Sequence, residues 1–349
     1  MNIMDLGGLG VVLVDDDLYL EPNTDYSDLA YPLTAVSLRD GNAILSFIQS
    51  NRNPTATILK SETSVHYTPA PAIPSFSSRG PSALTHNILK PDITAPGMNI
   101  IAAWSKKMSG YALAGRELPE YVLASGTSMS CPHISGVAAL VKSQHPTWDH
   151  SAIRSAIMTT AVQNSRAGAP IKNLPGLQKA TPYDFGAGEV NLAQVTNPGL
   201  VYETTTIDYY LFLCNYGYNL SIIRLIAKEI PEGFSCPKDA NADLISNMNY
   251  PSIAVAKFKP DTYRKITRTV TNVGDEEETA YTVTVDPPEY LDVKVIPEKL
   301  YFTKDIKKKS FEVKFSTLYP YKSGVWLDHL EQWPVQSGQS FCIDCQLRN

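Results

Sequence analysis

The chain has 349 residues, with an apolar fraction of 43%, a charged fraction of 19% and a formal net charge of −5. These values are ordinary for a soluble globular protein that holds two or three domains. Because the charge is mildly negative and no long basic run occurs, we expect no nucleic acid and no membrane surface as a partner. No apolar stretch approaches the ~20 residues that a membrane-spanning helix needs.

The first 64 residues alternate short apolar runs with acidic or proline-containing turns. Two of these runs are Gly10–Val14 and Ile44–Ile48, and the pattern indicates a small α/β or β module. Residues 1–14 are apolar but short, and Asp5 stands where a secretory signal would be basic. We therefore expect a buried strand here, and no signal peptide in this sequence.

Cysteines and acidic residues are the candidates for metal binding. The five cysteines are too few for a disulfide scaffold, lack the paired spacing of a zinc site, and leave at least one thiol outside any disulfide. Asp15–Asp17 with Glu21 could suggest calcium, but the EF-hand spacing is absent and a solvated loop is the preferred interpretation. We expect neither a metal ion nor an organic cofactor.

From about residue 248 onward the pattern changes to short alternating segments separated by turns. They are Ile266–Val270, Tyr281–Val285, Leu291–Val295, Leu300–Thr303 and Phe311–Phe315. Strands spaced by roughly ten residues predict an antiparallel β-sandwich. The basic run Lys307–Lys309 is most simply a solvated strand edge or turn.

The stretch most informative about chemistry is residues 121–136, YVLASGTSMSCPHISG. An apolar strand runs into Gly126, which permits a sharp turn, and a helix is predicted to follow and to continue through Val141. Ser128 then lies at a helix N-terminus, where unpaired N–H groups and the helix dipole favour negative charge. An oxyanion needs such a place during acyl transfer. Ser128 is therefore the candidate nucleophile, with its own backbone N–H as an oxyanion donor.

The plainer alternative for this turn is structural. Thr127 or Ser128 could be no more than the N-cap of the helix. Pro132 is predicted in the first helical turn, where its missing N–H costs little. Gly136, Ala138 and Ala139 predict a thin helix buried in a compact core.

The whole string matches the serine motif of subtilisins, Gly-Thr-Ser-x-(Ala/Ser)-x-Pro-His-x-(Ala/Ser)-Gly, and the chain resembles plant subtilases well beyond it. The matching segments are residues 75–81 (SFSSRGP), 89–97 (LKPDITAPG), 152–161 (AIRSAIMTTA), 185–188 (FGAG), 197–202 (NPGLVY), 249–253 (NYPSI) and 268–274 (RTVTNVG). The resemblance implies a serine endopeptidase that hydrolyses peptide bonds through an acyl-enzyme on Ser128. It also implies peptide or protein substrates and an extracellular location, in the apoplast or cell wall; the oligomeric state stays open.

The same resemblance supplies a domain plan. Residues 1–64 resemble a remnant of the protease-associated domain that plant subtilases insert into their catalytic domain. Residues 65–200 are the serine-bearing part of the α/β subtilisin-like domain with its parallel sheet, 201–247 a connecting segment, and 248–349 a fibronectin type III-like sandwich. Its tail after Leu327 departs from the family and is expected to be badly integrated.

In the family, the triad Asp, the triad His and the oxyanion Asn precede the inserted domain. The resemblance places the start of this chain inside that domain, so we expect an N-terminally truncated protein without the triad Asp and His. Asp5-Leu6-Gly7 only superficially resembles the family's Asp-Thr-Gly. The competing interpretation is an inactive pseudo-protease that at most binds a peptide or a partner.

No histidine of the chain is a convincing base. The six are His66, His86, His133, His145, His150 and His329. His133 projects about 140° away from Ser128 around the helix, so it is assigned a structural role. Cys131 is assigned no catalytic role, and Glu189 departs from the family's Gly-Ala-Gly-His.

Cys214 and Cys236 occur in contexts that resemble plant subtilases, and we predict a disulfide between them if the protein is secreted. The only N-glycosylation sequon, Asn219-Leu220-Ser221, lies between them and is expected to be exposed.

Overall fold

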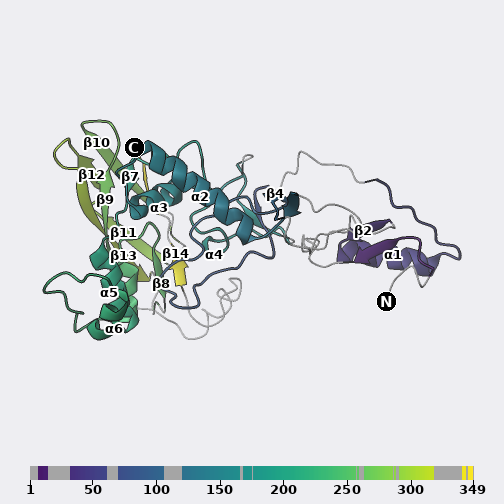
Figure 1. The fold of residues 1–349 in the computed structure, drawn as a ribbon, viewed down its shortest axis with the longest axis horizontal. Helices are drawn as coiled ribbons and strands as arrows, with labels where there is room; N and C mark the ends of the chain where they lie inside the picture. Colours follow the sequence, from purple (N-terminus) through teal and green to yellow (C-terminus); the bar gives the residue numbers. More distant parts are fainter. Residues whose placement is uncertain are drawn as a thin grey trace. The chain divides into compact units, whose positions relative to one another are not determined.

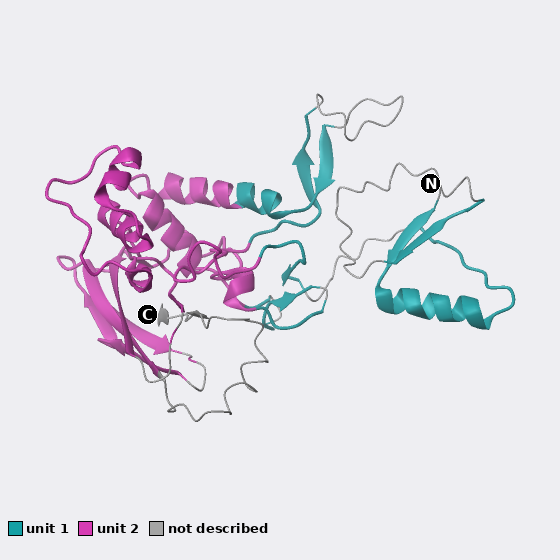
Figure 2. Ribbon diagram, turned by 90° about the horizontal axis from the view of Figure 1, so that it is seen from below, with its two compact units in different colours: residues 1–78, 95–133, 164–180 teal, residues 79–94, 134–163, 181–349 magenta. Residues whose placement is uncertain are grey.

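The computed structural model describes residues 7–14, 32–60, 70–105, 120–165, 168–174, 176–256, 258, 263–285, 287, 291–317, 340–342 and 345–348. The chain divides into two compact units, coloured separately in Figure 2. Unit 1 comprises residues 1–78, 95–133 and 164–180, and unit 2 comprises residues 79–94, 134–163 and 181–349. Among the described residues, no helix is both long and apolar enough to span a bilayer.

The described residues of unit 1 form three two-stranded sheets. Strands β1 (Val11–Val14) and β2 (Leu33–Val36) are parallel, as are β3 (Ala72–Ile73) and β6 (Lys172–Asn173), whereas β4 (Ile100–Ala103) and β5 (Tyr121–Ala124) are antiparallel. The α/β interpretation of the N-terminal segment is therefore favoured, because helix α1 (Leu38–Ser50) follows β2 (Figure 1). The expectation of a buried first strand is wrong for β1, since Val12 and Val14 are each 40% exposed.

Helix α1 begins where the sequence offers a cap. The Ser37 hydroxyl accepts the backbone N–H of Asp40 at 3.1 Å, and Asp40 places an acidic group in the first turn. Gly41 lets the helix approach β1, because a Cβ added at this position would lie 2.5 Å from a methyl group of Val14. The predicted apolar run 44–48 thus belongs to a helix.

Helix α2 (Thr127–Gln144) begins in unit 1 and ends in unit 2. The other helices of unit 2 are α3 (His150–Thr159), α4 (Pro182–Phe185), α5 (Thr206–Tyr216), α6 (Leu220–Ile226) and the 3₁₀ helix η4 (Ala242–Asn247). An apolar cluster of Val137, Val141, Ala156, Ile157 and Val195 joins the unit 2 part of α2 to α3. Ala156 and Ile157, which α3 contributes to this cluster, lie within the matched segment 152–161.

Asp149 is the N-cap that starts α3. Its carboxylate accepts the backbone N–H groups of Ser151 and Ala152, both at 2.9 Å. Burial disfavours the charged carboxylate, but these hydrogen bonds and that of the Ser151 hydroxyl outweigh it and lower the pKa of Asp149.

The β-sandwich follows the predicted alternation closely. One sheet has the order β11 (Leu291–Ile296), β13 (Lys308–Thr317), β9 (Tyr263–Asn272), β7 (Leu200–Val201), and the other has β12 (Lys299–Phe302), β10 (Thr279–Val285), β15 (Cys345–Arg348). All five predicted strands are present. Their inward side chains form one core with Val270, Leu300, Phe302 and Val313, each at most 2% exposed.

The basic run and the tail are the remaining expectations about the sandwich. Lys308 and Lys309 begin β13 and pair there with β9 alone, because β11 pairs only with residues 312–317, so the expected strand edge is confirmed for these two lysines. Lys308 is exposed and forms an ion pair with Glu203 at 2.9 Å. The tail is better integrated than expected, because β14 (Ser340–Cys342) pairs with β8 (Ala254–Ala256) and β15 pairs with β10. Residues 318–339 lie outside the described residues.

A buried asparagine connects distant parts of unit 2. Asn87 is 6% exposed; its Oδ1 accepts the backbone N–H of Ala256 at 2.8 Å and the Ser246 hydroxyl at 3.2 Å, and its Nδ2 donates to the carbonyl of Ala242 at 2.8 Å. One amide therefore links η4 to β8 and satisfies the buried N–H of Ala256.

The predicted disulfide is confirmed. Cys214 on α5 and Cys236 are bonded, with their Cα atoms 5.5 Å apart. Tyr210, Cys214 and Ile223 form a small buried cluster beside the bond, so the bridge holds α6 and the following loop against α5.

We expect N87A to lower the unfolding free energy of unit 2 by roughly 1–3 kcal/mol, because it orphans the buried N–H of Ala256 and removes the donor to the carbonyl of Ala242. N87D keeps the acceptor but sets an oxygen against the carbonyl of Ala242, so it should destabilise as well. Hydrogen exchange at Ala256 and thermal unfolding measure the effect, with exposed N53A as the control. An exchange rate at Ala256 equal to that of the parent protein would contradict the assignment.

Removing the disulfide with C214A/C236A should cost about 3 kcal/mol in the chain-entropy model, because the bond closes a 22-residue separation. Hydrogen exchange of α6 and limited proteolysis between residues 217 and 235 report the loss. C131A serves as the control, and equal protection of α6 in the parent and the double variant would exclude a stabilising role.

Candidate active site

The turn between β5 and α2 places the candidate nucleophile. Gly126 has a φ of +149°, a backbone conformation that favours glycine, and its N–H donates to the carbonyl of Gly97 at 2.8 Å. The hydroxyl of Ser125 accepts the N–H of Asn99 at 2.7 Å. The predicted order of strand, glycine turn and helix is confirmed, because α2 begins at Thr127.

Ser128 is the second residue of α2 and is exposed. The N–H of Met129 bonds to the carbonyl of Gly126 at 3.0 Å, whereas the preceding N–H groups at this end have no carbonyl one turn earlier in the helix. The structure gives the Ser128 hydroxyl no hydrogen bond among the described residues. The N-cap alternative is therefore weaker, because Thr127 and Ser128 lie within the helix and not before it.

Pro132 is not in the first turn, contrary to expectation. Counting from Thr127 it is the sixth helical residue, so its missing N–H leaves the carbonyl of Ser128 without the usual partner. One residue on, Nδ1 of His133 donates to the carbonyl of Met129 at 2.7 Å. The imidazole is thus bonded to its own helix, which agrees with the structural role predicted for His133.

A second serine supports this turn. The hydroxyl of Ser130 donates to the carbonyl of Ala95 at 3.0 Å. Gly97 lies against it, since a Cβ at this position would be 2.3 Å from Oγ of Ser130 and 3.0 Å from the carbonyl oxygen of Gly126. The sequence showed Gly97 within the matched segment LKPDITAPG but gave no sign of this close approach.

The other described histidines lie in unit 2 and are engaged there. His145 Nε2 lies 2.8 Å from the carbonyl of Thr196 and its ring stacks on Trp148, while His150 Nε2 lies 3.2 Å from the hydroxyl of Tyr209. His86 is half-buried in a loop. His66 and His329 lie outside the described residues, as do Asp5, Asp15–Asp17 and Glu21.

The matched segment FGAG is explained by two close backbone approaches in unit 2. A Cβ at Gly186 would meet the main chain of Asp92 at 2.5 Å, and one at Gly188 would meet the carbonyl of Val162 at 2.4 Å. Glu189 then exchanges two main-chain hydrogen bonds with Val162, at 2.8 and 2.9 Å. Its position in the fold is set by main-chain groups that any residue except proline provides.

Two apolar surfaces near the turn are more exposed than predicted. Gly136 and Ala139 of α2 are exposed, so this helix is buried only along Val137 and Val141. On the β4–β5 hairpin, Ile101 is paired with Leu123, and these side chains are 73% and 58% exposed. The hairpin therefore offers an uncovered apolar face.

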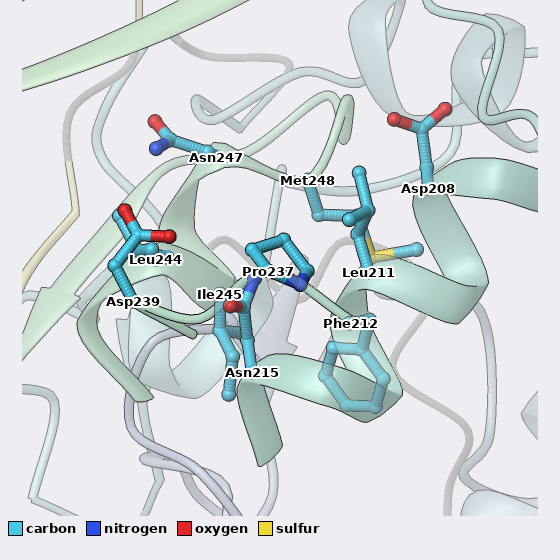
Figure 3. A pocket seen from close by; sticks show the side chains of 10 residues that line it. All are labelled: Asp208, Leu211, Phe212, Asn215, Pro237, Asp239, Leu244, Ile245, Asn247 and Met248. Atoms are coloured by element: carbon cyan, nitrogen blue, oxygen red, sulfur yellow. The ribbon is translucent and has the colours of Figure 1, made fainter. Parts of the chain in front are cut away.

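Unit 2 holds a cavity of about 230 Å³ that no sequence feature predicted. Figure 3 shows Leu211 and Phe212 of α5 on one side, Leu244 and Ile245 of η4 on the other, and Pro237 between them. Asp208 also lines the cavity. Its carboxylate accepts hydrogen bonds from the N–H and the hydroxyl of Thr205, the N-cap of α5, and so stabilises the start of that helix. Among the described residues, no cluster of His, Cys, Asp or Glu could hold a metal ion.

We expect G97A to destabilise unit 1 by about 1–3 kcal/mol, because the added methyl group collides with Ser130 and the Gly126 carbonyl. The double variant G97A/S130A removes one of the two collisions, so its loss should be smaller than the sum of the single losses. Unfolding followed by hydrogen exchange at residues 126–130 measures the coupling. Additive losses would show that Gly97 and Ser130 are not in contact.

Comparison with known proteins agrees with this geometry. Residues 29–188 match the family described as the subtilase family, and residues 247–330 match the fibronectin type-III domain. The matched region begins inside the range predicted as a protease-associated remnant, and no such domain is among these matches. That assignment and the domain boundaries stay predictions.

Relatives from Arabidopsis thaliana cover most of this chain. The CO(2)-response secreted protease is 49% identical over 320 residues, which are 92% of this chain and 41% of the relative. Subtilisin-like protease SBT5.1 is 48% identical over 316 residues, 89% of this chain and 40% of the relative. The chain thus spans about two fifths of the length of these relatives. With its glycine turn, serine helix and β-sandwich, the chain belongs to the subtilase family of plant subtilisin-like proteases.

Proposed function

We propose that this chain carries the nucleophilic half of a secreted serine endopeptidase, with Ser128 as the nucleophile. The observation that carries the proposal is the exposed hydroxyl of Ser128 on the second residue of α2, at the open end of a helix. Positive potential from the helix dipole and from unpaired N–H groups lies where a substrate carbonyl would gain negative charge. The substrates are peptides or proteins.

In this proposal, Ser128 Oγ attacks the carbonyl carbon of a peptide bond, and the backbone N–H of Ser128 donates to the resulting oxyanion. The bond to the leaving amine breaks, and water then hydrolyses the acyl-enzyme. Gly126 adds no side chain to the turn, and a Cβ there would have only the backbone nitrogen of Ser128 nearby, at 3.8 Å, which favours close approach of a substrate backbone.

The proton of Ser128 needs a base, and the described residues of unit 1 offer none. Among the described residues of unit 1, His133 is the one histidine, and its Nδ1 is bonded to Met129. In subtilisin, removing the histidine alone lowers turnover about 10⁶-fold. We therefore propose that the triad His and Asp come from residues other than these 349, and that this polypeptide alone is inactive.

The uncovered hairpin face supports a need for such additional residues. Ile101 and Leu123 lie side by side on β4 and β5, followed by the pair Ala103 and Tyr121, and Tyr121 is 64% exposed. Burying such side chains releases roughly 25 cal/mol for each Å² of apolar surface. A polypeptide segment that adds the missing base would bury this face. The second candidate function, a pseudo-protease that only binds a partner, uses the same surface without chemistry.

The test is a labelling experiment on the 349-residue polypeptide, alone and mixed with the part of the CO(2)-response secreted protease that this chain does not match. A fluorophosphonate probe should leave the polypeptide unlabelled when alone and should label Ser128 in the mixture. Peptide cleavage should appear with the label.

S128A is the matched control, because the Ser128 hydroxyl makes no hydrogen bond among the described residues and its loss leaves the fold intact. Labelling of Ser128 in the polypeptide alone would reveal a base among these residues. Labelling that persists in S128A would identify another nucleophile. Binding of the added segment without any label favours the pseudo-protease.

A further inference from the structure

Helix α6 exposes an apolar stripe to solvent. Ile222, Leu225 and Ile226 are 40%, 85% and 65% exposed, and their spacing places them on one side of the helix. Ile223, about 100° around the helix from Ile222, is fully buried in the cluster with Tyr210 and Cys214. Since the buried side already holds α6 to α5, the stripe is surface that the described fold leaves uncovered.

Asn219 stands at the beginning of this stripe, three residues before Ile222 and seven before Ile226. It is the exposed N-cap of α6, and its Oδ1 accepts the N–H of Ile222 at 3.0 Å. Among the described residues, the structure gives Nδ2 no hydrogen bond. The cap thus uses only Oδ1 of this amide, and Nδ2 makes no hydrogen bond within the described part of the chain.

The same asparagine begins the only N-x-Ser/Thr sequon of the chain, Asn219-Leu220-Ser221. The sequon lies within the loop closed by the Cys214–Cys236 disulfide, a bond that forms and persists in the secretory pathway. Glycosylation of such a sequon takes place in that compartment. Exposure, an unbonded Nδ2 and an oxidised loop therefore coincide at one residue.

We propose that Asn219 carries an N-linked glycan that covers the apolar stripe of α6. In the transfer, Nδ2 forms a bond to the anomeric carbon of an oligosaccharide held on a lipid pyrophosphate; the sugar–phosphate bond breaks, the amide loses one proton, and the lipid pyrophosphate leaves. The cap survives, because the substituted amide keeps Oδ1 for the N–H of Ile222. The proposal rests on the secretory route proposed above and is independent of any chemistry at Ser128.

The first experiment tests attachment by translating the chain, behind a secretory leader, with microsomes. The parent chain and S221T should gain one glycan, seen as a mass that an endoglycosidase removes. N219D and S221A should gain none, although N219D keeps the capping oxygen and S221A leaves Asn219 untouched.

E277N is the positive control, because it places a second sequon before Thr279 in an exposed turn whose Glu277 side chain is 79% exposed. It should carry two glycans. A parent chain without a glycan, in a preparation where E277N gains one, overturns the proposal whatever the outcome of the labelling at Ser128.

The second experiment tests coverage of the stripe on purified, secreted protein. An amidase that releases N-glycans leaves an aspartate in place of the asparagine, so N219D is its chemical equivalent. Both proteins should bind more of an apolar fluorescent dye than the glycosylated parent, and N219D/L225E should return to the parent level. Equal dye binding by the glycosylated parent, the amidase-treated protein and N219D would show that the glycan does not cover α6.

Discussion

Residues 200–204 are held from two sides, and the organisation of unit 2 depends on this. Leu200 and Val201 form β7, which pairs with β9 at the edge of the sandwich. The N–H groups of Tyr202 and Thr204 donate to the buried hydroxyls of Ser155 and Ser151 on α3, at 2.8 and 3.0 Å. Both serines are at most 1% exposed, so each bond satisfies groups that water cannot reach.

A polar network strengthens the same junction. The Tyr250 hydroxyl donates to Asp92 at 2.7 Å, and the guanidinium of Arg154 lies 4.6 Å from the centre of the Tyr250 ring. Burial, together with the Asp92 carboxylate, raises the pKa of Tyr250, which therefore stays protonated and donating. Arg268, 2% exposed, donates to the carbonyls of Tyr250 and Ser252. In this unit the sandwich is part of the support of α3 and not an appended module.

Local sequence patterns predicted the elements better than the contacts that join them. Alternating residues located all five sandwich strands, and Gly126 located the start of α2, because each signal is carried by a few adjacent side chains. The position of Pro132 within α2 was missed by one turn, since the helix begins directly after Gly126, which offers no side-chain cap. The bonds of Asn87 span more than 150 residues of sequence, and a single asparagine in a loop gives no sign of a distant partner. The cysteine pairing was predictable only through the family resemblance.

The main-chain pairing of Glu189 with Val162 bears on how departures from a family motif are interpreted. A Cβ at Gly188 would collide with the backbone of Val162, so this position requires glycine. The next residue, Glu189, is held in place by the hydrogen bonds of its own N–H and C=O groups. Any residue except proline at position 189 can therefore make the two main-chain bonds to Val162, whereas position 188 has no room for a side chain. A departure from Gly-Ala-Gly-His at position 189 is thus compatible with an unchanged backbone pairing at this point of the fold.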